Sequence, residues 1–136
     1  MTEDAPPPRV ARIVGVYDAD GGVLGELRYA AGAAFARRHC ALCDLTHRGV
    51  RPRADWNALV SDVEAKGAAL LVLHRNEQPE SVRAVTKATG LPVIVAEVAG
   101  SWSVVLDGDA LARCRGDLTQ FSAALNDAIN AHGWSL

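Results

Sequence analysis

The sequence predicts a single α/β domain. The chain has 136 residues, of which 49% are hydrophobic and 22% charged, a composition typical of a globular protein with one core. Four short apolar runs rich in β-branched residues are each bounded by turn-forming residues, which is typical of buried strands. They span residues 10–17, 68–74, 91–98 and 102–108. Amphipathic segments lie between and after these runs, so we expect helices packed on a sheet.

The first strand is "VARIVGVY", residues 10–17, and the turn sequence "DADGG" follows it. The acidic, proline-rich residues 1–9 are expected to form a flexible tail, which leaves residues 10–136 as the domain. This start lacks the basic residues and the apolar stretch of a secretory signal, so we expect a cytoplasmic protein. The net charge of −2 argues against nucleic-acid binding. No segment approaches the roughly 20 apolar residues of a membrane span.

One long helix is predicted over residues 23–45. Its core face is formed by apolar residues at helical spacing, which are Leu24, Leu27, Ala31, Ala34, Phe35, Leu42 and Leu45. A basic loop, "HRGVRPRAD", follows at residues 47–55. A second helix is expected to begin at residue 54 or 55 and to stop at Gly67.

The second half of the chain predicts a helix, a hairpin and a final helix. After the strand at 68–74, Pro79 marks a helix start and Gly90 its end. The strands at 91–98 and 102–108 are close enough to form a hairpin, and a single helical turn is expected at 109–114. In the last helix, 117–133, Asp117 is the expected N-cap, and the buried stripe consists of Phe121, Leu125 and Ile129.

This element order resembles the thioredoxin-like (glutaredoxin) core, with Pro92 where that superfamily keeps a cis-proline. The resemblance implies a thioredoxin-like single domain with a four-stranded mixed sheet in the order 2-1-3-4, flanked by helices. Thioredoxins carry Cys-x-x-Cys directly after the first strand, whereas this chain has residues 18–22, "DADGG", at that point. We therefore expect no ordinary thioredoxin activity.

The motif "HCALCDLTH", residues 39–47, contains two cysteines and two histidines. At about 100° per residue on a helix, His39, Cys40, Cys43 and His47 fall within one quadrant, away from the core stripe. Two thiolates and two imidazoles suit zinc, and copper or an iron–sulfur cluster are further candidates. The sequence therefore predicts a metal- or cofactor-binding protein.

Four ligands on one continuous helix cannot surround a tetrahedral ion, because neighbouring positions diverge from a common axis. The shell would be completed if the helix ended near Cys43, so that His47 folds back, or by ligands from elsewhere. The candidates are Cys114, His74 or a second copy of the chain in a homodimer.

Two other functions remain open for these nine residues. Cys40 and Cys43 could form the redox pair of a thiol-disulfide oxidoreductase, although a helix C-terminus disfavours a thiolate. Alternatively, the cysteines are packing residues, the histidines stabilise the helix end, and the protein is a non-catalytic interaction domain. Three cysteines in all argue against a disulfide framework.

Two further resemblances concern the same half of the chain. The strand leading into "GVYDADGGVLGELRY", followed by the motif, resembles a group of uncharacterised bacterial proteins that share HCxxCxxTH, which implies no activity. The stretch "VYDADGGVL" is similar to the first motif of haloacid-dehalogenase phosphatases, which implies Asp18 as nucleophile and Asp20 as general acid beside Mg²⁺. A strand-to-helix turn rich in Asp and Gly is the structural alternative.

Overall fold

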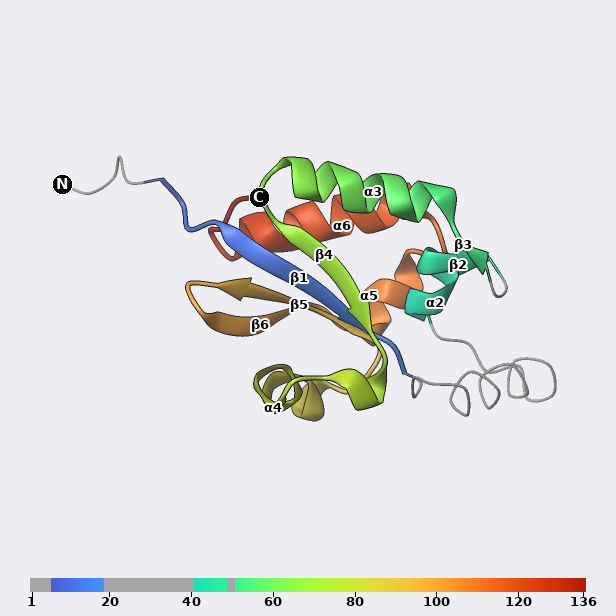
Figure 1. Ribbon diagram of the computed structural model, residues 1–136, viewed down its shortest axis with the longest axis horizontal. Helices are drawn as coiled ribbons and strands as arrows, with labels where there is room; N and C mark the ends of the chain where they lie inside the picture. Colours follow the sequence, from blue (N-terminus) through green and yellow to red (C-terminus); the bar gives the residue numbers. More distant parts are fainter. Residues whose placement is uncertain (1–5, 19–40, 49–50) are drawn as a thin grey trace.

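A computed structural model of the chain describes residues 6–18, 41–48 and 51–136. At its centre is a four-stranded sheet of β1 (Val10–Val16), β4 (Ala69–Leu73), β5 (Val93–Val98) and β6 (Ser101–Leu106). Their order in space is β4-β1-β5-β6, and helices flank the sheet (Figure 1). Numbered along the chain, this is the order 2-1-3-4, so the predicted α/β class and sheet order are confirmed.

The sheet is mixed, as expected. β1 runs parallel to β4, with Val16 opposite Leu73, and antiparallel to β5, with Val16 opposite Val93. β5 and β6 form the predicted hairpin around the turn at Ala99 and Gly100, where both residues have positive φ. The Leu91–Pro92 peptide bond at the entrance to β5 is cis. Because β1 and β4 are parallel, their carboxyl ends lie at the same edge of the sheet.

Helices cover both faces of the sheet. On one face lie α3 (Ala54–Ala65) and α6 (Leu118–Ala131), and on the other lies α4 (Glu80–Thr89) (Figure 1). The short helix α5 (Gly108–Arg113) follows β6 and is a full element, rather than the predicted single turn at 109–114. Asp117 caps α6 as predicted, because its carboxylate accepts hydrogen bonds from the backbone N–H groups of Thr119 and Gln120.

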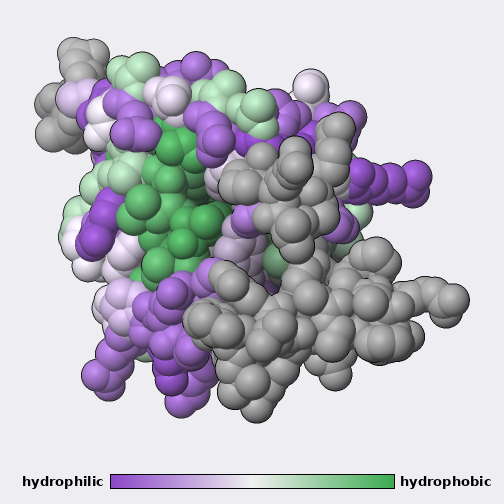
Figure 2. Space-filling model, turned by 45° about the vertical axis from the view of Figure 1, so that its right-hand side comes forward, coloured by the Kyte–Doolittle hydropathy of each residue, from purple (hydrophilic) through white to green (hydrophobic). Residues whose placement is uncertain are grey.

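Each face of the sheet has its own hydrophobic cluster. The larger one includes the predicted stripe of α6, namely Phe121, Leu125 and Ile129, all at most 2% exposed. The smaller one lies under α4 and is built from valines: Val14, Val16, Val82, Val93 and Val95. Figure 2 shows a hydrophobic patch on the surface between α3 and α4, where β4 is the outermost strand of the sheet. Each fully buried side chain of the two clusters stabilises the fold by roughly 1.5–3 kcal/mol.

Between Ala41 and α3 the structure differs from the prediction, while residues 19–40 lie outside the described ranges. Of the predicted helix 23–45, the described part is α2 (Ala41–Thr46), which extends one residue further; its Leu42 and Leu45 are buried as expected. The predicted loop 47–55 contains a two-stranded hairpin, β2 (His47–Arg48) and β3 (Arg51–Pro52). His47 pairs with Pro52 and Arg48 with Arg51, a local contact that the glycine and proline content did not reveal.

The two ends of the described chain pair with each other. The backbone N–H of Val10 donates to Ser135, and that of Ser135 donates to Pro8. A 3-10 turn, η2 (Arg75–Glu77), links β4 to α4. Among the helices in the described part of the chain, none is long and apolar enough to cross a membrane.

Candidate functional site

Polar side chains gather where β1 and β4 end. Tyr17 directly follows β1, and His74 directly follows β4. The junction of α2 and β2 adds Thr46 and His47. The edge formed by the carboxyl ends of parallel strands is where α/β folds commonly place ligands.

α2 is held against this edge by close packing on β1. A Cβ atom at Gly15 would lie 3.0 Å from Leu42 Cδ2, 3.1 Å from Ile94 Cδ1 and 3.3 Å from Val72 Cγ1. Gly15 therefore makes room for Leu42, which is fully buried. This contact places the following residues of α2 beside the end of β1.

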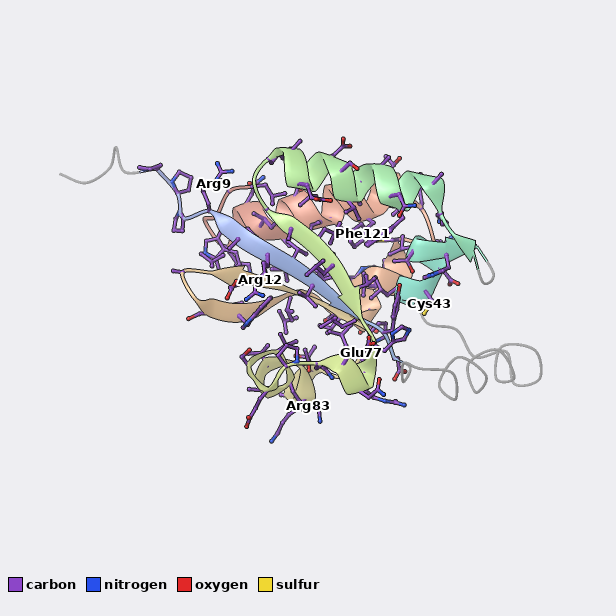
Figure 3. The ribbon with its side chains drawn as sticks, viewed as in Figure 1. Arg9, Arg12, Cys43, Glu77, Arg83 and Phe121 are labelled. Atoms are coloured by element: carbon purple, nitrogen blue, oxygen red, sulfur yellow. The ribbon has the colours of Figure 1, made fainter. Side chains whose placement is uncertain are left out.

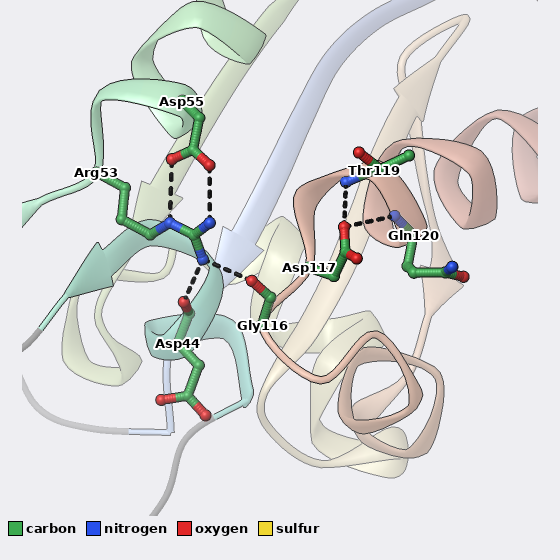
Figure 4. A network of polar contacts seen from close by, with 7 residues as sticks. All are labelled: Asp44, Arg53, Asp55, Gly116, Asp117, Thr119 and Gln120. Atoms are coloured by element: carbon green, nitrogen blue, oxygen red, sulfur yellow. Dashed lines mark hydrogen bonds and ion pairs between the residues drawn. The ribbon is translucent and has the colours of Figure 1, made fainter.

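Arg53 fixes α2 from its other side (Figure 4). Its guanidinium makes a bidentate ion pair with Asp55, with contacts of 3.0 and 2.7 Å. Nη1 also donates to the backbone carbonyls of Asp44 (3.0 Å) and Gly116 (2.6 Å). One side chain thus ties α2, the start of α3 and the loop before α6 together. The same ion pair lowers the pKa of the Asp55 carboxyl.

The Thr46 hydroxyl is the centre of the polar cluster. It is 2.8 Å from the Tyr17 hydroxyl and 2.8 Å from His47 Nδ1. It also donates to the carbonyl oxygen of Cys43 at 3.4 Å. Thr46 and Tyr17 are only 1% and 3% exposed, so water does not compete for these bonds.

Two imidazoles flank the Tyr17 ring. The ring centroid of His47 is 6.2 Å from that of Tyr17, and the centroid of His74 is 5.0 Å from it. Burial lowers the pKa of His47, and the positive charge of protonated His74 lowers it further. His47 is therefore biased toward the neutral form, which is the form that binds a metal ion.

His74 is held by Glu77 of the η2 turn. Glu77 Oε1 accepts hydrogen bonds from the backbone N–H of His74 at 2.7 Å and from His74 Nδ1 at 2.8 Å. These two bonds lower the pKa of the Glu77 carboxyl, the backbone bond having the larger effect. A His–carboxylate pair of this kind orients an imidazole whose other nitrogen is available.

Two of the four predicted metal ligands, Cys43 and His47, lie in the described part of the chain. Cys43 is half-buried and packs partly against the larger core cluster, while His47 follows the helix in β2, so a helical wheel does not describe its direction. Figure 3 shows Cys43 and Glu77 toward the same end of the sheet. His39 and Cys40 lie outside the described residues, and the predicted Cys40–Cys43 redox pair stays a prediction for that reason.

The two candidate ligands from other elements differ in character. His74 joins the cluster beside Tyr17. Cys114, by contrast, is 3% exposed within the larger core cluster, and its Sγ donates to the carbonyl of Ala110 at 3.5 Å. Burial raises the pKa of the Cys114 thiol, which disfavours the thiolate that a metal requires. Within residues 6–18, 41–48 and 51–136, no group of three or more His, Cys, Asp or Glu residues is placed to hold a metal ion.

The residues of the phosphatase-like motif are only partly described. The Asp18 carboxylate is half-exposed and lies 3.4 Å from Arg75 Nη1, while Asp20 falls outside the described ranges. Asp107, which follows β6, accepts a hydrogen bond from the backbone N–H of Ala110 and caps α5. That carboxylate has a structural role.

Sequence reasoning did not single out Tyr17, Thr46 or Glu77. A tyrosine at the end of an otherwise apolar strand was a usable signal for Tyr17, because its hydroxyl needs a partner when buried. Thr46 lies inside the nine-residue motif, but its role depends on a contact with β1. Glu77 follows His74 by three residues, a spacing compatible with a local hydrogen bond in a turn.

Comparisons of the chain with protein-family models, with curated proteins and with solved structures found no match.

Proposed function

We propose that the protein binds a transition-metal ion, zinc in the first place, through the Cys/His cluster of residues 39–47. The ligands would be His39, Cys40, Cys43 and His47. The observation that supports this most is the arrangement of His47, which has Nδ1 hydrogen-bonded to a buried hydroxyl at 2.8 Å. Metal-binding histidines are commonly held in this way through the ring nitrogen that does not bind the metal.

The chemistry of the described donors fits a borderline metal ion. Cys43 offers sulfur and His47 offers an imidazole biased toward its neutral form. Sulfur and nitrogen donors together suit Zn²⁺, and they also suit copper or an iron–sulfur cluster. His74 is the better candidate for an added ligand, because Glu77 orients it and it lies beside Tyr17.

The described donors alone do not complete a coordination shell. The proposal therefore needs His39 and Cys40, or a second copy of the chain that supplies the missing donors across a two-fold axis. A reducing cytoplasm would keep the thiols available for the metal. We propose no nucleic-acid partner, in line with the net charge of −2.

Elemental analysis of untagged, anaerobically purified protein tests the proposal. We expect bound zinc in the wild type, and loss of the metal in Cys43→Ser and His47→Gln. Cys114→Ser and His132→Gln are matched controls, since Cys114 is a core residue and His132 stacks on Trp134 at the far end of α6. A visible absorption band would reassign the metal to copper or iron–sulfur. Protein that carries no transition metal, either as isolated or after reconstitution, would refute the proposal.

A further inference from the structure

The proton of the Thr46 hydroxyl can be assigned by counting donors and acceptors. A threonine hydroxyl has one proton to donate and two lone pairs to accept with. It has three neighbours here: the Cys43 carbonyl at 3.4 Å, the Tyr17 hydroxyl at 2.8 Å and His47 Nδ1 at 2.8 Å. The carbonyl oxygen can only accept, so the bond to Cys43 forms only when Thr46 donates its proton there. All three bonds then form only if Tyr17 and His47 both donate to Thr46.

This assignment fixes the chemical form of His47. We infer that Thr46 holds neutral His47 in the tautomer with the proton on Nδ1, so that Nε2 is the nitrogen that His47 offers to a ligand. The tautomer follows from the contacts of Thr46 alone. Its use in binding a metal ion through Nε2 rests on the proposed function.

Burial makes the arrangement stable. Because Thr46 and Tyr17 are 1% and 3% exposed, a bond broken here would not be replaced by a hydrogen bond to bulk water. Tyr17 fills the second lone pair of Thr46 and also contacts both imidazole rings. Thr46 is thus the positioning residue for His47, and Tyr17 supports Thr46.

His74 is an internal comparison within the same cluster. An ionised carboxylate can only accept, so the 2.8 Å contact with Glu77 puts the proton of neutral His74 on Nδ1 as well. Nε2 is then the unprotonated ring nitrogen of both imidazoles beside Tyr17. His132, which stacks on Trp134 at a centroid distance of 4.2 Å, has no such acceptor in the described part of the chain.

Long-range ¹H–¹⁵N NMR of the histidine rings in the metal-free protein tests the tautomer directly, at a pH where His47 is neutral. We expect Nδ1–H for His47 in the wild type, a loss of that preference in Thr46→Val, and its return in Thr46→Ser. His132→Gln is the matched control, since His132 stacks on Trp134 and takes no part in the Thr46–His47 bond. A proton on Nε2 of His47 in the wild type would overturn the inference, whether or not any variant folds.

Metal affinity supplies the second measurement. Removal of such an orienting group typically weakens metal binding about 10–100-fold. We expect Zn²⁺ affinity to fall by this factor in Thr46→Val and to recover in Thr46→Ser. Equal affinity in Thr46→Val and the wild type would overturn the positioning role of Thr46. Absence of Zn²⁺ binding in the wild type would instead refute the proposed function, while the NMR result would still decide the tautomer.

Discussion

Leu42 of α2 packs directly over Gly15 of β1, so closely that a Cβ atom at residue 15 would lie 3.0 Å from Leu42 Cδ2. This contact joins the segment that carries the Cys/His motif to the central strand of the sheet. The site therefore depends on a position that has no functional group of its own.

Gly15→Ala is expected to destabilise the fold and to displace α2. The added methyl group would also lie 3.1 Å from Ile94 Cδ1, and overpacking of a core typically costs about 1–3 kcal/mol. Chemical denaturation measures this loss, and the Zn²⁺ affinity of the variant should fall with it. In Gly108→Ala, the control, the nearest atom would be 3.5 Å away, so no loss is expected. Wild-type stability in Gly15→Ala would contradict the packing described for α2.

Arg53→Ala is expected to lower the free energy of unfolding by about 1–3 kcal/mol, because the carbonyls of Asp44 and Gly116 lose a charged donor. Arg53→Lys should recover little of this, since an ammonium group cannot make the bidentate contact with Asp55 as well. Denaturant titration provides the measurement. Arg83→Ala, at an exposed position on α4, is the control and should stay within about 0.5 kcal/mol of the wild type. Equal effects of the two alanine variants would show that Arg53 does not tie these elements together.

Glu77 predicts a particular loss of stability in acid. Its pKa is lower in the folded protein than the usual value of about 4.3, so its ionised form stabilises the fold above that value. The contribution disappears as the pH falls through the lowered pKa. We therefore expect the metal-free wild type to be more stable than Glu77→Gln at pH 7, and the difference to shrink below about pH 4. Unfolding curves across this range measure the difference; Glu64→Gln, at an exposed position on α3, serves as control. A pH-independent difference would contradict this account.

The two described cysteines should react at different rates with an alkylating reagent. Burial raises the pKa of the Cys114 thiol, and its Sγ donates a hydrogen bond to the carbonyl of Ala110. Cys43, by contrast, is only half-buried. Because the thiolate is the reactive form, Cys114 should be modified only on unfolding. Peptide mass spectrometry after timed iodoacetamide treatment, with and without denaturant, checks this. Rapid modification of Cys114 in the native protein would show that its thiol is accessible and would favour it as an added metal ligand.

Local sequence signals were sufficient for most of the fold. The apolar runs around Ile13, Leu70 and Val95 marked strands, and Gly67 and Gly90 marked helix ends, because these features depend on nearby residues alone. The stripe of Phe121, Leu125 and Ile129 gave the buried face of α6 for the same reason. The β2–β3 hairpin was missed because each strand has only two residues, too few for a periodic pattern.

The sequence by itself determined the α/β class, the sheet order and the presence of a thiol and imidazole cluster in residues 39–47. Only the tertiary structure decided which groups surround His47. Thr46 meets Tyr17 across 29 positions of sequence, and the two rings of His47 and His74 come together around Tyr17 because β1 and β4 end at the same edge. Spacing along the chain does not predict such contacts, because they depend on the parallel register of β1 and β4 and on the small volume of Gly15.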